Sequence, residues 1–257
     1  MKNLRIILLL FLLLTATALH AQKAASSQKE NLRAPSNIKI DGKLTEWGDK
    51  LQAYSNHTQF YYTISNDNKY LYLTIQAKYH EIITRILKGG ITLTINKSGN
   101  RADTNSVQIT YPIIKPFIIR FGDAPDAKHG GGAASAKLDT FVNETNINLD
   151  SQTKFIRVAG IKGVDTLISV YNLDGIKAAS GIDKQLRFNY ELAISLQDLG
   201  MDINNPQKFN YQVMINETEK LFKSGPHKRG EIYVEVSGPA VDPQPATDFW
   251  GEYTLAR

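Results

Sequence analysis

Apolar and polar residues alternate with a period of two over much of the chain from residue 36 to its end. In the stretch 70–77, for example, Leu71, Leu73 and Ile75 fall on one side and the residues between them on the other. The same alternation recurs in residues 91–96, 188–194 and 231–236. Because successive side chains of a strand point to opposite faces, the pattern predicts strands that each require a core on one side only.

Turn-forming residues separate these segments from further predicted strands. Apolar and β-branched runs indicate strands near residues 36–40, 57–65, 106–111, 117–121, 154–159, 166–172 and 208–216. Asn, Asp, Gly and Pro gather in turns at residues 66–68, 97–100, 174–175 and 204–206. About ten short strands spaced by turns predict an all-β fold, an antiparallel and jelly-roll-like β-sandwich.

Helical periodicity is confined to one or two short segments. Residues 79–88 carry isoleucine and leucine at helical spacing, and Gly89-Gly90 follows as a C-terminal stop. A shorter helical turn is expected over residues 195–199, ended by Gly200. Neither segment resembles the repeated crossover helices of a parallel sheet, which favours the β-sandwich.

Two stretches are predicted to be loops. Residues 122–137 contain a run of three glycines, and residues 238–248 contain three prolines. Loops of this length inside a compact domain are usually functional or mobile. The chain shows no internal repeat and no linker, so residues 36–257 are expected to form a single domain.

The first 21 residues have the composition of a secretory signal peptide. Lys2 and Arg5 precede an apolar run of nine residues, Ile6–Leu14, and small residues follow up to Ala21. Nine apolar residues are too few to cross about 30 Å of hydrocarbon as a helix. We therefore predict cleavage after Ala21, or in the Ala16–Ala18 stretch, and a secreted or periplasmic protein with no transmembrane span. Residues 22–35 are polar and are predicted to be a flexible lead-in.

Composition excludes several classes of function. The 257-residue chain has no cysteine, which rules out disulfides, thiolate metal sites, a cysteine nucleophile and a lipobox anchor. Loss of Lys2 and Arg5 with the signal peptide leaves 28 basic and 25 acidic residues, a net charge of +3. So small a net charge on a chain of this length argues against a nucleic-acid partner.

Several short motifs resemble those of family 9 carbohydrate-binding modules and their DOMON-like relatives. The most distinctive is the opening Ile38–Trp47, which contains the sequence IDGKLTEW. Four further stretches fit the same family in order, at residues 66–73, 90–99, 190–196 and 249–255, although Ser195 stands where proline is more usual. The resemblance implies a β-sandwich that presents loops or a concave face to a glycan. The sugar-stacking aromatic residues of that family lie outside the matched motifs, so no binding residue is carried over.

The opening motif also has a physical interpretation of its own. Asp41-Gly42 is a tight-turn pair, in which Asp accepts local N–H groups and Gly adopts a positive φ. Trp47 follows at the start of the next segment. It is interpreted as a structural residue that closes one end of the sandwich, with a sugar platform as the alternative.

Catalytic motifs are absent from the sequence. No G-x-S-x-G element occurs, and His80-Glu81 lacks the second histidine of a zinc protease because Thr84 occupies that position. Glu191 and Asp198 are a conceivable carboxylate pair for glycoside hydrolysis. Glu191, however, alternates out of the apolar register of its strand, so a solvated face is the expected position.

Aromatic side chains provide the better candidates for binding. Tyr61, Tyr72 and Tyr233 alternate opposite the apolar residues of their strands, as does Tyr70, and Trp250 follows the proline-rich loop. Sugars stack their C–H faces on such rings while flanking polar groups bind the hydroxyls. Tyrosine is also a good strand former without any ligand. Trp250, Tyr61, Tyr72 and Tyr233 are the predicted ligand-binding residues.

Metal and cofactor signals are weak. Calcium is conceivable near Asp67 or near Asp123 and Asp126, but no loop has regular spacing of oxygen ligands. Haem, which some DOMON-like domains bind through Met and His, would need a Met–His pair that no matched motif supplies. The basic turn around His227 is interpreted as a solvated loop, with an anionic glycan or lipid head group as the alternative. No cofactor is therefore predicted.

These observations predict an exported, non-catalytic protein that binds an oligo- or polysaccharide through surface aromatic residues. The first alternative is a structural or interaction domain of the cell envelope, with a protein partner, that has lost sugar binding. The second alternative is a glycoside hydrolase that uses Glu191.

Overall fold

The structure is a computed structural model that describes most of the predicted domain. It covers residues 24–48, 51–101, 103, 105–114, 124–125, 131–218 and 244–257, with only the backbone of 131–134. The predicted signal peptide and the strands predicted at 117–121 and 231–236, including Tyr233, lie outside the described residues.

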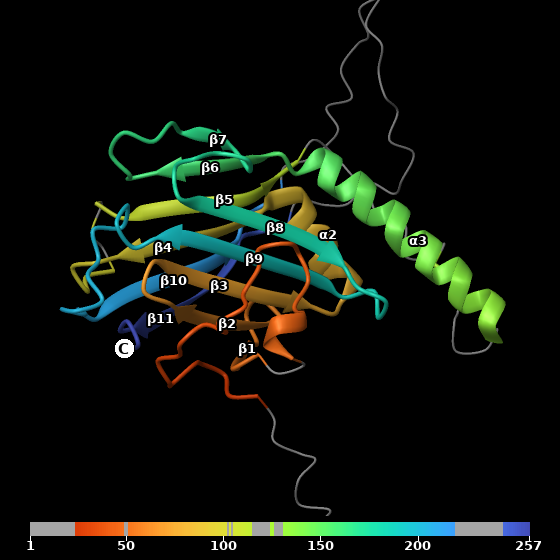
Figure 1. The fold of residues 1–257 in the computed structure, drawn as a ribbon, viewed down its shortest axis with the longest axis horizontal. Helices are drawn as coiled ribbons and strands as arrows, with labels where there is room; N and C mark the ends of the chain where they lie inside the picture. Colours follow the sequence, from red (N-terminus) through yellow and green to blue (C-terminus); the bar gives the residue numbers. More distant parts are fainter. Residues whose placement is uncertain are drawn as a thin grey trace, which may run out of the picture.

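Eleven strands in the described residues form two antiparallel sheets, which confirms the predicted all-β sandwich (Figure 1). Sheet A has the order β1 (Ala53–Ser55), β2 (Phe60–Asn66), β3 (Tyr70–Ala77), β9 (Phe188–Ser195) and β8 (Ile176–Ile182). Sheet B has the order β11 (Thr247–Tyr253), β10 (Phe209–Ile215), β4 (Ile91–Asn96), β5 (Val107–Ile113), β6 (Phe155–Ala159) and β7 (Leu167–Ser169). Consequently β8 and β7 are edge strands.

Apolar side chains from the inner faces of both sheets form one core. The ring of Tyr62 in β2 lies 4.5 Å from that of Phe249 in β11, centroid to centroid, and the rings of Tyr111 in β5 and Tyr190 in β9 lie 5.7 Å apart. These pairs join sheet A to sheet B. The alternation that predicted the strands thus identifies their core-facing side chains correctly, because a two-layer sandwich buries the inner face of each sheet.

In the described ranges, two helices and one short 3-10 helix accompany the sheets. The 3-10 helix η1 spans Thr45–Trp47, and α2 spans His80–Gly89, which confirms the helix predicted at 79–88. The long helix α3, Gly131–Gln152, was not predicted, and the loop expected over 122–137 is wrong where it overlaps α3. The buried face of α3 includes Thr145 beside Val142 and Leu149, so the apolar stripe is too short to indicate a helix from the sequence.

The strand predictions fail at two places that matter for the site. Residues 36–40 form no strand, and β8 was not predicted at all. The sequence of β8, IKAASGI, contains Ala, Ser and Gly between its two isoleucines, so it lacks the β-branched and aromatic residues typical of strands. Pairing with β9 over its whole length, from Ile176 to Ile182, makes it a strand.

The segment before β1 lies against sheet A. Its first part follows the β2 edge, where the Gln28 side chain bonds both the N–H and the C=O of Ile64 at 2.7 Å and Arg33 forms a bridge with Asn66. The described part of the predicted lead-in therefore contacts the sandwich. Its later part, residues 40–48, crosses the outer face of β8, where Gly42 lies directly on the backbone of Ser180.

Candidate functional site

Glu191 occupies a position opposite to the expected one. It does lie on the outward side of β9, but residues 40–48 cover it, and it is 0% exposed. Its Oε2 accepts hydrogen bonds from the N–H groups of Asp41 and Gly42, each at 3.0 Å. The solvated position predicted for Glu191 is therefore wrong. Its carboxylate fixes the turn of the IDG motif to sheet A.

Burial makes Glu191 an unusual acid. Desolvation raises the pKa of its carboxyl to about 7, against the opposing effect of the two N–H donors, and the carboxylates of Asp41 and Glu46 raise it further. Its Oε1 has no hydrogen-bond partner among the described residues. Asp198, its suggested partner in hydrolysis, lies in the turn after β9, where its N–H donates to the hydroxyl of Ser195 at 3.4 Å.

The turn itself follows the sequence interpretation. Asp41 Oδ1 accepts a hydrogen bond from the N–H of Lys43 at 3.0 Å, and Gly42 has a φ of +77°. Trp47, in η1, is half-buried, and its indole N–H has no partner among the described residues. Asp41 and Gly42 thus act structurally as predicted, whereas the indole N–H of Trp47 lacks the local partner that was expected.

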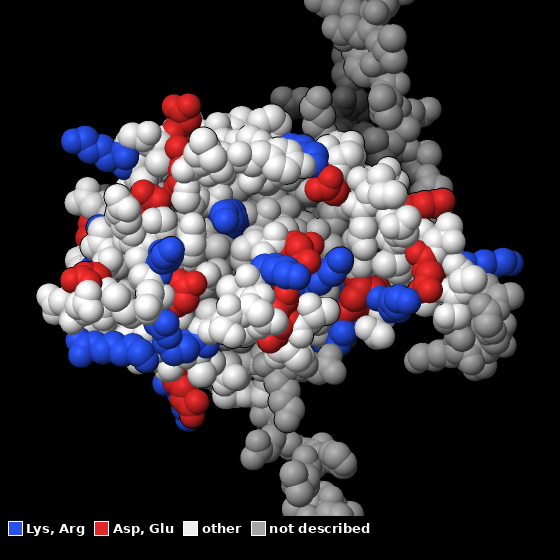
Figure 2. Space-filling model, in the orientation of Figure 1, with Lys and Arg blue, Asp and Glu red and all other residues white. Residues whose placement is uncertain are grey.

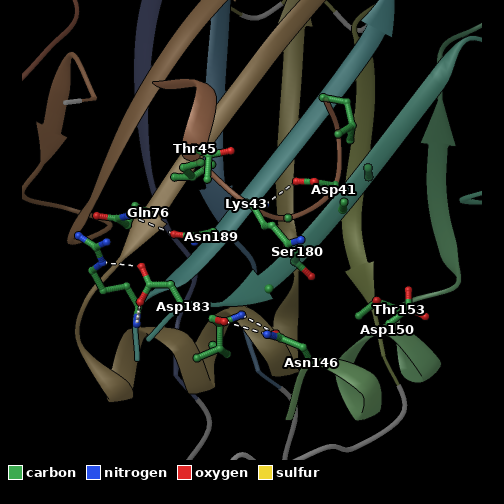
Figure 3. Close-up of a pocket in the computed structure, with 18 of the residues that line it drawn as sticks. Asp41, Lys43, Thr45, Gln76, Asn146, Asp150, Thr153, Ser180, Asp183 and Asn189 are labelled. Atoms are coloured by element: carbon green, nitrogen blue, oxygen red, sulfur yellow. Dashed lines mark hydrogen bonds and ion pairs between the residues drawn. The ribbon is translucent and has the colours of Figure 1, made fainter. Parts of the chain in front are cut away.

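A groove of about 1180 Å³ runs along β8. Residues 40–45 form one wall, and Val142, Asn146 and Asp150 of α3 form part of the other, as the close-up shows for Asp41, Lys43, Asn146 and Asp150 (Figure 3). Acidic and basic side chains are mixed on this face of the molecule (Figure 2). The groove therefore offers no field of a single sign.

Most polar side chains of the groove already bind one another. Arg187 Nε donates to Asp183 Oδ2 at 2.6 Å, Gln76 Nε2 donates to Asn189 Oδ1 at 3.1 Å, and Lys184 pairs with an Asp of α3 at 2.8 Å. Pre-paired side chains have little remaining capacity for the many hydroxyls of a sugar. The groove is therefore a poorer glycan site than its size suggests.

The outer face of sheet B is different, because it carries a row of polar side chains beside a tryptophan. The strand register places Trp250 of β11 opposite Gln212 of β10, Gln212 opposite Thr94 of β4, and Thr94 opposite Gln108 of β5. Neighbouring strands lie about 4.8 Å apart, so the row is about 14 Å long. We call these four residues the sheet B row.

The sheet B row has free hydrogen-bonding capacity. Gln212 Nε2 donates to Asp248 at 2.5 Å and Thr94 is buried, at 6% exposure, whereas the exposed amide of Gln108 binds no other described residue. Trp250 is half-buried, and the Arg101 guanidinium lies 5.4 Å from the centroid of its ring. A shallow hollow of about 460 Å³, lined in part by Gln108 and Arg157, adjoins the row. The face combines a half-buried tryptophan with the unpaired, exposed amide of Gln108.

The predicted tyrosines do not join Trp250. Tyr61, on sheet A, is half-buried with its ring 4.8 Å from that of Tyr54, and Lys78 lies over it at 4.2 Å. Tyr72 is 4% exposed, and its hydroxyl donates to Asp67 Oδ2 at 2.7 Å. The sequence places the Tyr72 ring on the outward side correctly, but the ring is not accessible to a ligand.

Candidate metal and haem ligands remain scattered. In the part of the chain that the structure describes, no group of three or more His, Asp or Glu side chains could hold a metal ion. The Asp67 carboxylate accepts hydrogen bonds from the N–H groups of Lys69 and Tyr70. Asp123, Asp126 and His227 lie outside the described residues.

Sequence reasoning missed the partners of Trp250 and both side chains that flank β8. Gln212, Thr94 and Gln108 are ordinary outward residues of strands, and only the strand order 11-10-4-5 places them next to Trp250. Asn146 and Asn172, which bond the backbone of β8, belong to an unpredicted helix and a turn. No local signal marks them.

Among the described helices, none is both long enough and apolar enough to cross a membrane. No model of a known protein family matches the chain, and a search of curated proteins also finds no match.

Proposed function

We propose that this protein binds carbohydrate without catalysing its cleavage, and that the sheet B row is the binding surface. The observation that carries the proposal is the register that places the half-buried Trp250 in line with Gln212, Thr94 and Gln108. An aromatic ring in line with an unpaired, exposed amide is a combination that suits sugars.

The chemistry of such a surface is simple. The C–H face of a pyranose ring stacks on the indole of Trp250, which removes apolar surface from water. The exposed amide of Gln108 both donates and accepts hydrogen bonds, so it suits the hydroxyls of an adjacent sugar unit. A row of about 14 Å accommodates a short stretch of an oligosaccharide.

A binding role without catalysis is favoured by the state of Glu191. Its Oε2 is occupied by two backbone N–H groups, and residues 40–48 separate it from solvent. A general acid must reach the oxygen of the scissile bond. Because a signal peptide is predicted, the proposed binding would take place outside the cytoplasm, in the periplasm or after secretion.

The test is a glycan array of plant, fungal and bacterial polysaccharides, followed by calorimetry on the best oligosaccharide. Trp250→Ala is expected to weaken binding at least tenfold, which corresponds to about 1.4 kcal/mol. Trp250→Phe, which keeps a ring, should lose less. Tyr79→Ala is the matched control, because Tyr79 is an aromatic residue 55% exposed outside this face.

Unchanged thermal unfolding of Trp250→Ala would show that lost affinity reflects the surface and not the fold. Absence of binding to every glycan, or equal binding by wild type and Trp250→Ala, would contradict the proposal.

A further inference from the structure

The outer edge of β8 contains unpaired backbone groups. Gly175 C=O accepts from Ser195 N–H at 2.9 Å, and Asp183 N–H donates to Arg187 C=O at 3.0 Å. In an antiparallel ladder the bonded residues alternate, so the odd-numbered residues of β8 bond to β9. The N–H and C=O groups of the even-numbered residues point away from β9, toward the groove.

Asparagine side chains occupy both ends of this edge. Asn146 of α3 accepts from Ile182 N–H at 2.7 Å and donates to Ile182 C=O at 2.8 Å, as the backbone of a neighbouring strand would. At the other end, Asn172 donates to Ile176 C=O at 2.7 Å. Between them, the backbone N–H and C=O of Ala178 and Ser180 face the groove with no bond to any described residue. Four hydrogen-bonding groups thus remain available in a row.

The edge lies inside the groove, which restricts what can pair with it. Ala178 is 8% exposed, and the groove is bounded by α3 on one side and by residues 40–45 on the other (Figure 3). The two asparagines leave only Ala178 and Ser180 of this edge unpaired, a stretch that a short extended peptide is long enough to bond. The volume of about 1180 Å³ also exceeds the roughly 300–1,000 Å³ of small-molecule pockets.

The two sides of the groove differ in chemistry. On the core side, the Ser180 hydroxyl lies 3.3 Å from that of Tyr111, and Val142 also lines the space. On the outer side, Lys43 and Lys177 line it without an acidic partner among the described residues. Because side chains of an added strand alternate between these sides, apolar residues suit one and acidic residues the other.

The geometry points to β8 as a docking edge for an extended peptide of a partner protein. The peptide adds a sixth strand to sheet A by bonding the backbone of Ala178 and Ser180. Its side chains alternate between apolar residues toward Tyr111 and acidic residues toward Lys43 and Lys177. Main-chain bonds supply the affinity, and the alternate side chains supply the specificity. This site lies on sheet A and is independent of the sheet B row.

The experiment uses the full mature chain and a synthetic peptide, acetyl-TVEVEVT-amide, as the probe. Amide hydrogen exchange is expected to be fast at Ala178 and Ser180 in the free protein and at least tenfold slower with saturating peptide. The same peptide N-methylated on its central residues keeps its side chains but cannot bond the edge. It should bind about tenfold more weakly or worse.

Ala178→Pro removes an edge N–H without breaking the β9 ladder and should weaken peptide binding at least tenfold. Ala178→Ser keeps the N–H and is the matched control, with affinity within about twofold of wild type. Lys177→Glu should weaken binding of the acidic peptide. It should strengthen binding of the same peptide with lysine in place of both glutamates.

Three results would overturn the inference. The first is protection of both amides in the free protein, which would mean that the chain itself or a second copy fills the edge. The second is equal binding of the N-methylated peptide. The third is protection of the same amides by a glycan and not by the peptide.

Discussion

The outer faces of the two sheets start from the same sequence pattern but differ in how completely they are covered. On sheet A, Thr63, Thr74 and Glu191 alternate outward, yet all three are at most 1% exposed, because the segment before β1 covers them. On sheet B, Gln108 and Arg157 also alternate outward and are exposed, although Thr92, Thr94 and Thr110 of the same face are at most 8% exposed. The structure describes no comparable covering segment over the sheet B row.

This difference separates two roles for polar side chains. Where the face is covered, polar groups bind the cover: Thr63 Oγ1 accepts from Gln52 N–H at 3.0 Å, and Glu191 binds the Asp41-Gly42 turn. Where the face is open, groups such as the Gln108 amide have capacity left for a ligand. Alternation thus indicates which side of a strand faces away from the core, but not whether that side meets solvent.

The largest loss of stability is expected where residues 40–48, which cover the outer face of sheet A, contact β8. At Gly42, with a φ of +77°, a Cβ would lie 2.6 Å from the backbone carbon of Ser180. Gly42→Ala should lower the free energy of unfolding by about 4 kcal/mol, from left-handed strain plus the clash. Urea unfolding measures it.

Gly99→Ala is the matched control for the clash. Gly99 has a similar φ of +72° but no atom within 4 Å of the added Cβ, so only the strain of about 1–2 kcal/mol remains. Equal losses in the two variants would mean that residues 40–48 do not press on β8.

The next effect concerns pH. A pKa of about 7 in the folded protein against 4.5 when unfolded means that the folded state holds the Glu191 proton more tightly. The contribution of Glu191 to stability is therefore greatest below about pH 4.5, and about 3 kcal/mol of it is lost as the pH rises through 7. Glu191→Gln should remove this slope, measured as the difference between wild-type and variant unfolding free energies from pH 4 to 8.

A solvated Glu191 would behave differently. Its pKa would be ordinary, and the wild-type and Glu191→Gln stability curves would then run parallel across this range. Such parallel curves would contradict the covered face of sheet A.

The smallest effects compare matched threonines on the two faces. Thr63→Val should cost about 1–2 kcal/mol, because Gln52 N–H loses its acceptor under the cover. Thr94→Val removes a hydroxyl with no described partner and should change stability by less than about 0.5 kcal/mol. Thermal unfolding of both variants provides the comparison, and a larger loss for Thr94→Val would reverse our assignment of the two faces.

In the candidate sites too, the features that the sequence predicts are local, and the features that it does not predict depend on contacts between distant segments. Trp250 was a predicted binding residue, because a tryptophan next to a proline-rich loop is visible in the sequence. The rest of the sheet B row was not, because Gln108 and Trp250 are separated by more than a hundred residues and meet only through strand order. The β8 edge was missed because a strand of Ala, Ser and Gly carries no local signal.

The sequence by itself determined the strands with strong alternation, their inward side chains, helix α2 and the Asp41-Gly42 turn. All of these depend on neighbours within a few residues. Only the tertiary structure decided that Glu191 is buried, that Tyr72 is covered and that β8 lies at an edge. The reason is that these outcomes rest on contacts between distant segments, such as the bond that joins Gly42 to Glu191 across 149 residues. Alternation with a period of two predicts which side chains point away from the core. It does not predict whether a distant segment of the chain covers them.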